Sequence, residues 1–310
     1  DQTSSITPGA PLNARVIPAP ATPSLASGEE RAIAFGGGGE WFTCWTLAYA
    51  ATAKAHGVDL SNVDVTVGTS AGSIMGSYLT SGRVDSAYTQ FKELAAHPEA
   101  LEKVVVTDTG AESQVRATKV LSTATSTGTE SIKEIARAAM ASKNASAETY
   151  AASLEKLLFG NTWPSQAHHV TAIDCYTGER VIIAHDSGIP IATACAASSS
   201  VPGVNGPVWI DDHYCMDGGI STSSTHSDLV AGAKRVIVFS LMSQAPKSGA
   251  FGFAMRIDPD SIHAEVRYLE SQGSKVMLIC ANPADGTTFM DPAQMALALE
   301  LGAARAAKDA

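Results

Sequence analysis

The sequence has few charged residues, an excess of acid over base, and no long apolar run. Charged residues make up 17% of the 310 positions, and 21 basic against 31 acidic residues give a net charge of −10 at pH 7. An acidic chain is not expected to bind nucleic acid, or to dock on anionic lipid by charge alone. No stretch approaches ~18 consecutive apolar residues, so we expect no membrane span. The hydrophobic content of 45% nevertheless predicts a well-filled core.

Cysteines are scarce and scattered. They are odd in number, and neither a Cys-x-x-Cys pair nor a Cys/His cluster with metal spacing occurs. Acidic clusters with calcium-loop spacing are also missing. We therefore expect no metal and no cofactor, and we expect buried, reduced thiols. The five cysteines are Cys44, Cys175, Cys195, Cys215 and Cys280.

The first 30 residues are rich in Pro, Ala, Ser and Thr and lack periodicity. We interpret residues 1–30 as an N-terminal arm or linker, and residues 31–310 as one large domain. We expect a soluble protein and favour the cytoplasm. Because the chain starts at Asp1 rather than Met, export after removal of a signal peptide is the alternative.

The stretch that organises the chain is Gly68-Thr69-Ser70-Ala71-Gly72. An alternating apolar run at 63–67 precedes it, and a helix-like run to about Ser81 follows. This order predicts a strand, a tight turn and a helix. Such a turn lifts the serine Oγ above the edge of the sheet and aims the amides of the helix N-terminus towards it. Glycine at positions 68 and 72 suits the crowded backbones. Ser70 is therefore the candidate nucleophile.

Four consecutive glycines, Gly36 to Gly39, join an apolar run at 31–35 to a predicted helix at 40–56. Their unobstructed N–H groups at a helix N-terminus form an anion cradle. A dinucleotide fingerprint fails because its third glycine would have to be Trp41 or Phe42. A P-loop fails because no lysine follows. An oxyanion hole needs only the amides. A flexible glycine turn is the alternative.

A second acidic stretch runs from Val208 to Gly219. Two short strands are predicted to meet at a turn containing Asp211 and Asp212, and the second strand ends at Asp217. Gly218 and Gly219 leave room for close approach to that carboxylate. Asp217 is the candidate general base, and a helix cap is the alternative.

The remaining segments predict the α/β class. Apolar runs at 234–241 and 274–280 are continuous, and they alternate with helical patterns, which is typical of a mostly parallel sheet covered on both faces. A hairpin is predicted at 169–184, where a structural role is favoured for His168, His169 and His185. The other predicted helices are 84–96, 189–199, 260–272 and 291–308.

Residues 99–160 differ in composition, with Ala, Ser, Thr, Glu and Lys dominant and large apolar residues sparse. Helices are predicted at 131–140 and 147–159, with Thr129 and Ser146 as caps. We interpret this region as a helical insertion near the site. Lids and ordinary covers of a sheet share this composition, so both roles stay open.

Together, the glycine run with Glu40, the Ser70 turn and the motif Asp217-Gly218-Gly219 resemble the patatin-like phospholipase family. The segment from Ala197 to Val208 is also similar to bacterial members. The resemblance covers about Ile33 to Ala310, apart from 99–160. It implies a three-layer α/β/α sandwich and a lipid acyl hydrolase with a Ser–Asp dyad and no histidine. Many members carry Arg or Lys and then Gly where this chain has Glu40 and Trp41, although a bacterial subgroup has Gly-Gly-Gly-Gly-Glu.

The roles that this resemblance implies are specific to residues. Ser70 is the expected nucleophile and Asp217 its base, and the amides of Gly37, Gly38 and Gly39 are expected to hold the oxyanion. The supporting motif positions are Gly36, Gly68, Gly72, Gly218 and Gly219. The headgroup and acyl preferences do not follow from the resemblance.

Three other functions stay open. An acyltransferase would use the same dyad, whereas an α/β-hydrolase esterase would add His226 or His263 to form a triad. A lipid-binding protein could keep the fold without catalysis. The expected partner is a lipid or another acyl ester, with peripheral membrane contact through apolar residues. Trp41, Phe42 and Trp45 either line an acyl groove or belong to the core, and the core is favoured for Trp45.

Overall fold

The computed structural model describes residues 14–104, 109–244 and 257–310. Residues 1–13 of the expected arm and 105–108 of the expected insertion lie outside the described residues. The strands are β1 Arg15–Val16, β2 Arg31–Phe35, β3 Val65–Thr69, β4 His168–Asp174, β5 Arg180–Ile183, β6 Val208–Ile210, β7 His213–Asp217, β8 Arg235–Ser240 and β9 Lys275–Cys280. The helices are α1 Gly39–Ala55, α2 Ala71–Thr80, α3 Val84–Ala96, α4 Glu99–Val104, α5 Glu112–Thr123, α6 Thr129–Ala141, α7 Ala147–Leu157, α8 Ile191–Ser198, α9 Ser261–Ser271 and α10 Met295–Asp309, with 3-10 turns η1 Ser227–Val230 and η3 Pro292–Gln294.

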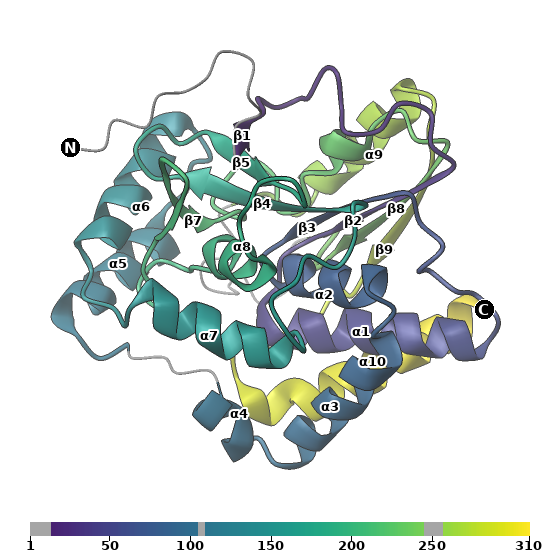
Figure 1. The fold of residues 1–310 in the computed structure, drawn as a ribbon, viewed down its shortest axis with the longest axis horizontal. Coiled ribbons are helices and arrows are strands. Elements are labelled where there is room, and N and C mark those ends of the chain that lie inside the picture. Colours follow the sequence, from purple (N-terminus) through teal and green to yellow (C-terminus); the bar gives the residue numbers. More distant parts are fainter. Residues whose placement is uncertain (1–13, 105–108, 245–256) are drawn as a thin grey trace.

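The strands of the described residues form one sheet (Figure 1), in the order β1-β5-β4-β3-β2-β8-β9. The five strands from β4 to β9 along this order are parallel to one another. β5 and β7 both pair antiparallel with β4, and β6 completes a short hairpin with β7. The mostly parallel α/β sheet predicted from the continuous apolar runs is confirmed.

Each face of the sheet has its own core, as the alternation of side chains along β2 shows. Ile33 and Phe35 point into a large cluster with α1, α2, α3, α7, α8 and α10. Ala32 and Ala34 point the opposite way, into a smaller cluster with η1 and α9. Successive residues of a strand face opposite sides, so a strand that is apolar at every position is covered twice. Helices accordingly lie on both sides of the sheet (Figure 1).

The strand before Ser70 differs from its predicted range of 63–67. β3 begins two residues later and includes Gly68, which pairs with Phe35 on β2 and with Val170 on β4. Val63 instead turns back, and its N–H donates to the Ser61 carbonyl. Because β3 lies between two parallel partners, the partners rather than the local alternation determine where it begins and ends.

The region 99–160 is helical, as predicted, but the prediction missed α4 and α5. α5 buries only Gln114, Ala117 and Leu121, which is too weak an apolar pattern to detect in the sequence. The Ser146 cap is confirmed, since its Oγ accepts the Thr149 N–H at 3.1 Å. The Thr129 cap is wrong, because Gly128 precedes the helix and Thr129 is its first residue.

Two smaller expectations concern the C-terminus and the cysteines. Asp291 caps a 3-10 turn by accepting the Ala293 N–H at 3.0 Å, and the α-helix predicted from 291 begins only at Met295. The five cysteines are free and buried, which agrees with the expected reduced thiols.

His168 is a buried neutral histidine within the sheet. Its Nδ1 accepts the Thr66 hydroxyl at 2.8 Å, and its Nε2–H donates to the Ser73 carbonyl at 2.9 Å. Burial lowers the pKa of His168 to about 3. The unfolded chain therefore takes up a proton near the ordinary pKa of 6.5, while the folded protein does not.

We expect the free energy of unfolding to fall as the pH drops from 6.5 towards 3, by up to about 1.4 kcal/mol per pH unit for this one proton. Denaturant unfolding of the parent and of His168→Gln at several pH values measures the difference in slope. His168→Gln should flatten the dependence, whereas His56→Gln, at an exposed position, should not. Equal slopes in the parent and His168→Gln would contradict this account.

Candidate functional site

Ser70 occupies a sharp turn between β3 and α2. Its backbone has φ 55° and ψ −120°, a conformation that costs about 1–3 kcal/mol for a residue with a side chain. Three hydrogen bonds hold it. The Ser70 N–H donates to Ser198 Oγ at 2.7 Å, and the Ser70 carbonyl accepts the N–H and the hydroxyl of Ser73 at 2.8 and 2.6 Å. The strained turn is therefore fixed on both sides.

The two glycines that flank the turn are required by close backbone approach. A Cβ on Gly68 would collide with the Gly72 carbonyl oxygen, and one on Gly72 would collide with the Phe35 carbonyl oxygen. The first turn of α2 thus lies directly against the ends of β2 and β3. The crowding expected from the sequence at positions 68 and 72 is present.

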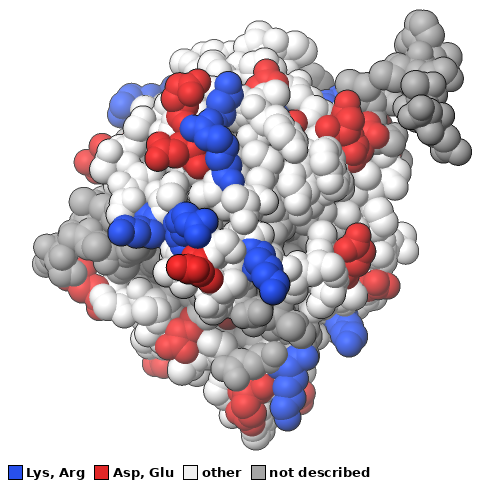
Figure 2. All heavy atoms as spheres, turned by 90° about the vertical axis from the view of Figure 1, so that its left-hand side faces the viewer, with Lys and Arg blue, Asp and Glu red and all other residues white. Residues whose placement is uncertain are grey.

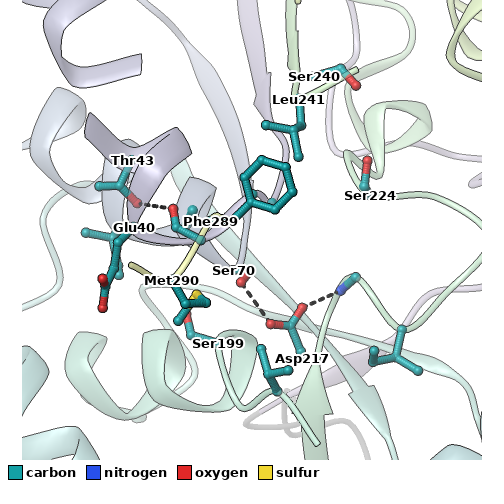
Figure 3. Close-up of a pocket in the computed structure, with 18 of the residues that line it drawn as sticks. Glu40, Thr43, Ser70, Ser199, Asp217, Ser224, Ser240, Leu241, Phe289 and Met290 are labelled. Carbon is teal, nitrogen blue, oxygen red and sulfur yellow. Dashed lines mark hydrogen bonds between the residues drawn. The ribbon is translucent and has the colours of Figure 1, made fainter. Parts of the chain in front are cut away.

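Asp217 lies at the end of β7 and faces Ser70 (Figure 3). Ser70 Oγ donates to Asp217 Oδ2 at 2.8 Å, and the Gly219 N–H donates to Asp217 Oδ1 at 2.8 Å. The carboxylate is buried. Gly218 allows this arrangement, since a Cβ there would lie 2.6 Å from the Thr171 carbonyl oxygen. Two residues 147 positions apart are thereby brought into direct contact.

The glycine run forms the loop between β2 and α1 and abuts Ser70. A Cβ on Gly37 would lie 3.3 Å from Ser70 Cβ. The N–H groups of Gly36 and Gly37 are already bonded, to the carbonyls of Phe239 and Ser224 at 2.8 and 3.2 Å. Within the described residues, the amides of Gly38 and Gly39 have no such partner. Gly38 and Gly39, which line the same cavity as Ser70, thus have unused donors.

Neither candidate histidine of the triad alternative occupies the position between Ser70 and Asp217. His226 is buried, and both its ring nitrogens are engaged elsewhere: Nε2–H donates to the Gly218 carbonyl at 2.7 Å, and Nδ1 accepts from Arg180 at 3.3 Å. Burial and the Arg180 charge lower the pKa of His226 to about 4. His263 is exposed, with Nε2 bonded to the Ser243 carbonyl at 3.1 Å.

A hydroxyl-rich segment at 223–228, which we call the brace, supports both halves of the site. Its carbonyl at Ser224 accepts the Gly37 N–H, and its His226 contacts the Gly218 carbonyl. Two carboxylates anchor the segment. Asp228 accepts both guanidinium nitrogens of Arg180 at 2.7 and 2.8 Å. Glu265 Oε1 accepts the hydroxyls of Ser223, Thr225 and Ser227 at 2.7–2.9 Å. The sequence analysis missed the brace, although its run of hydroxyl side chains was a visible signal.

A cavity opens over Ser70 and Asp217 (Figure 3), and its wall is mainly apolar. Helices α3, α4, α5 and α7 supply much of this wall, so the 99–160 region contributes directly to the site. Of the two roles left open for Trp41, Phe42 and Trp45, the acyl groove is wrong and the core, already favoured for Trp45, is confirmed. These aromatics are buried in the core, where the Phe42 and Trp45 rings stack. The apolar side chains from α2 to α7 that line the cavity are Ile74, Phe91, Leu101, Leu121, Leu154 and Leu157.

None of the helices among the described residues is long and apolar enough to cross a membrane. No group of three or more His, Cys, Asp or Glu among these residues is arranged to hold a metal ion.

The fold and site define an α/β protein in which a serine on a strand–turn–helix faces a buried carboxylate beside a glycine loop. A family model described as patatin-like phospholipase matches residues 33–228, more than half of the chain. The chain therefore belongs to the patatin-like phospholipase family, and it is a lipid acyl hydrolase whose substrates are lipid esters.

Two solved structures are similar to this chain. VipD from Legionella pneumophila has 12% identity and a TM-score of 0.46, over 91% of this chain and 67% of that chain. The type III effector protein ExoU has 12% identity and a TM-score of 0.35, over 95% of this chain and 54% of that chain. The chain thus spans little more than half the length of the ExoU chain. A comparison with curated proteins gave no significant match.

We predict that His226 positions the Asp217 loop and does not act as a base. In His226→Ala, kcat for a p-nitrophenyl acyl ester should fall about tenfold with little change in KM, because the buried Gly218 carbonyl loses its donor. His226→Gln, whose amide replaces Nε2–H, should recover part of this loss. A catalytic histidine would instead cost up to about a millionfold in kcat, with no rescue by glutamine.

Proposed function

We propose that this protein is a serine acyl hydrolase in which Ser70 is the nucleophile and Asp217 the general base. The supporting observation is the 2.8 Å hydrogen bond that Ser70 Oγ donates to Asp217 Oδ2. A serine hydroxyl must lose its proton as it attacks, and a carboxylate within this distance can accept it.

The reaction then follows in two halves. Ser70 Oγ bonds to the carbonyl carbon of the ester, and its proton passes to Asp217. The tetrahedral intermediate collapses, and the leaving alkoxide takes that proton as the alcohol departs. In the second half, Asp217 removes a proton from water, the hydroxide attacks the acyl-enzyme, and Ser70 Oγ leaves with the proton while the carboxylic acid is released. An acyltransferase would replace this water by an acceptor alcohol.

The proposed oxyanion hole is the glycine loop. The amides of Gly38 and Gly39 are the available donors, and one well-placed donor is worth roughly 3–4 kcal/mol to the transition state. Gly37 would join them only if its N–H left the Ser224 carbonyl. The N-terminus of α2 adds its dipole from the other side.

The acyl chain is proposed to lie along the wall formed by α3, α4, α5 and α7. In this proposal residues 99–160 are an insertion within the catalytic domain that binds the acyl chain. Where the insertion covers the cavity, it also acts as a lid. Peripheral contact with a lipid surface is proposed through apolar residues at the rim, such as Met290, which lines the cavity and is 41% exposed. Basic and acidic side chains are interspersed on the face drawn in Figure 2, so charge does not draw that face to anionic lipid.

The dyad is tested with Ser70→Ala and Asp217→Asn against a p-nitrophenyl acyl ester. Both should lose kcat by at least about a thousandfold, because each removes a group that acts in the transition state. A fluorophosphonate should label the parent at Ser70 and leave Ser70→Ala unlabelled. Full activity in either variant would end the dyad model, and an unlabelled, inactive parent would favour a non-catalytic lipid-binding protein.

The acyl wall is tested with Leu154→Ala, which enlarges the cavity from α7. We expect the preferred acyl chain to become longer, measured as kcat/KM over p-nitrophenyl esters of increasing length. Leu79→Ala is the matched control, since Leu79 is a buried leucine of α2 that does not line the cavity. Both truncations should cost about 2–5 kcal/mol of stability. An equal shift in chain length for both variants would contradict the proposed wall.

A further inference from the structure

The cavity over Ser70 carries carboxyl groups and, among the described residues that line it, no Lys, Arg or His. Four acidic side chains take part, from α1, β7, α9 and the loop before α9. A lipid phosphate is normally held by cationic side chains or by several amides, since its charge must be neutralised when water is displaced. The described lining of this cavity is acidic and would repel a phosphate. The four acidic residues are Glu40, Asp217, Asp258 and Glu265.

The other polar groups of the lining are uncharged. They are hydroxyls and one amide, which can both donate and accept hydrogen bonds. Such groups, together with carboxylates, complement the hydroxyls of a polyol and do not complement an anion. The uncharged polar side chains are Thr43, Tyr150, Ser199, Asn205, Ser224, Ser240 and Ser261.

Glu40 is the acidic residue that the rest of the structure leaves unexplained. It lines the cavity from the first turn of α1, directly after the glycine loop (Figure 3). Its Oε2 is buried and has no hydrogen-bond partner among the described residues. A buried carboxyl oxygen without a partner is costly, so a substrate group that donates to it would gain free energy.

The ionisation of Glu40 also favours a hydroxyl over a phosphate as its partner. Burial, with a smaller contribution from the charge of Asp291, raises the pKa of Glu40 to about 7. The carboxyl therefore has an appreciable neutral fraction near pH 7, and it can donate as well as accept. Either form suits a hydroxyl, whereas the ionised form repels a phosphate.

We propose that the alcohol half of the substrate is an uncharged polyol, such as glycerol, and that Glu40 selects against a phosphate there by binding a free hydroxyl. This inference rests on the proposed acyl hydrolase function and names its substrate class. Removing the carboxylate charge should therefore change the ratio of kcat/KM between two leaving groups, and an effect on the oxyanion, which both esters share, cancels in that ratio.

The test uses two esters with the same acyl chain, 1-oleoylglycerol and 1-oleoylglycerol 3-phosphate, presented in micelles of one neutral detergent. Release of oleate gives kcat/KM for each. We expect the uncharged ester to be favoured at least tenfold by the parent. Glu40→Gln should narrow this ratio at least threefold, and Glu40→Lys should narrow it further or reverse it. Glu300→Gln, at an exposed position on α10, should leave the ratio unchanged.

Three outcomes would overturn the inference: equal or faster cleavage of the phosphate ester by the parent, an unchanged ratio in Glu40→Lys, or cleavage of neither glycerol ester while a p-nitrophenyl ester is hydrolysed. Absence of p-nitrophenyl ester hydrolysis in the parent is a different result. It would remove the proposed hydrolase function itself, and the inference with it.

Discussion

The hydrogen bond between Ser70 Oγ and Asp217 Oδ2 depends on strand register. Thr69, at the end of β3, pairs with Thr171 on β4, and the next residue of β4, Ala172, pairs with Asp217 at the end of β7. β3 and β4 are parallel, whereas β7 approaches β4 from the opposite direction. The Ser70 and Asp217 side chains therefore meet because β7 runs antiparallel to β4 just beyond the end of β3. A shift of β7 by one residue would turn the carboxylate to the other face.

The same constraint explains where backbone strain and buried polar groups are concentrated. Ser70 adopts its unfavourable conformation because α2 begins immediately and lies against β2, at a distance that only glycine permits. The brace at 223–228 then fills the space beneath the site with hydroxyls, one carboxylate and a buried ion pair. Networks of this kind are costly when incomplete, but when every member is bonded they fix one arrangement. The rigidity of the site thus comes largely from hydrogen-bonded side chains outside the Ser70–Asp217 pair.

Much of this arrangement could be predicted from local sequence. The Gly-x-Ser-x-Gly turn, the four glycines and the Asp-Gly-Gly motif each imply a backbone geometry within a few residues. What escaped prediction depends on contacts between distant segments: the limits of β3, which its two partners determine, and the link from Glu265 to the brace about 40 positions away. The orientation of α1 also escaped prediction. The sequence left the groove and the core open for Trp41 and Phe42, whereas α1 turns both into the core and leaves Glu40 and Thr43 on the cavity.

The acidic lining creates a tension with the proposed chemistry, because the transition state itself develops negative charge. Ionised carboxyls near Ser70 disfavour an oxyanion, and this repulsion is strong where water is excluded. Two features reduce it. In the proposed mechanism the amides of Gly38 and Gly39 and the N-terminus of α2 supply positive dipoles at the reacting carbonyl, and burial favours the neutral form of Glu40. An anionic headgroup would add charge that nothing in the described lining offsets. The acidic lining that the oxyanion must tolerate therefore also favours an alcohol half without charge.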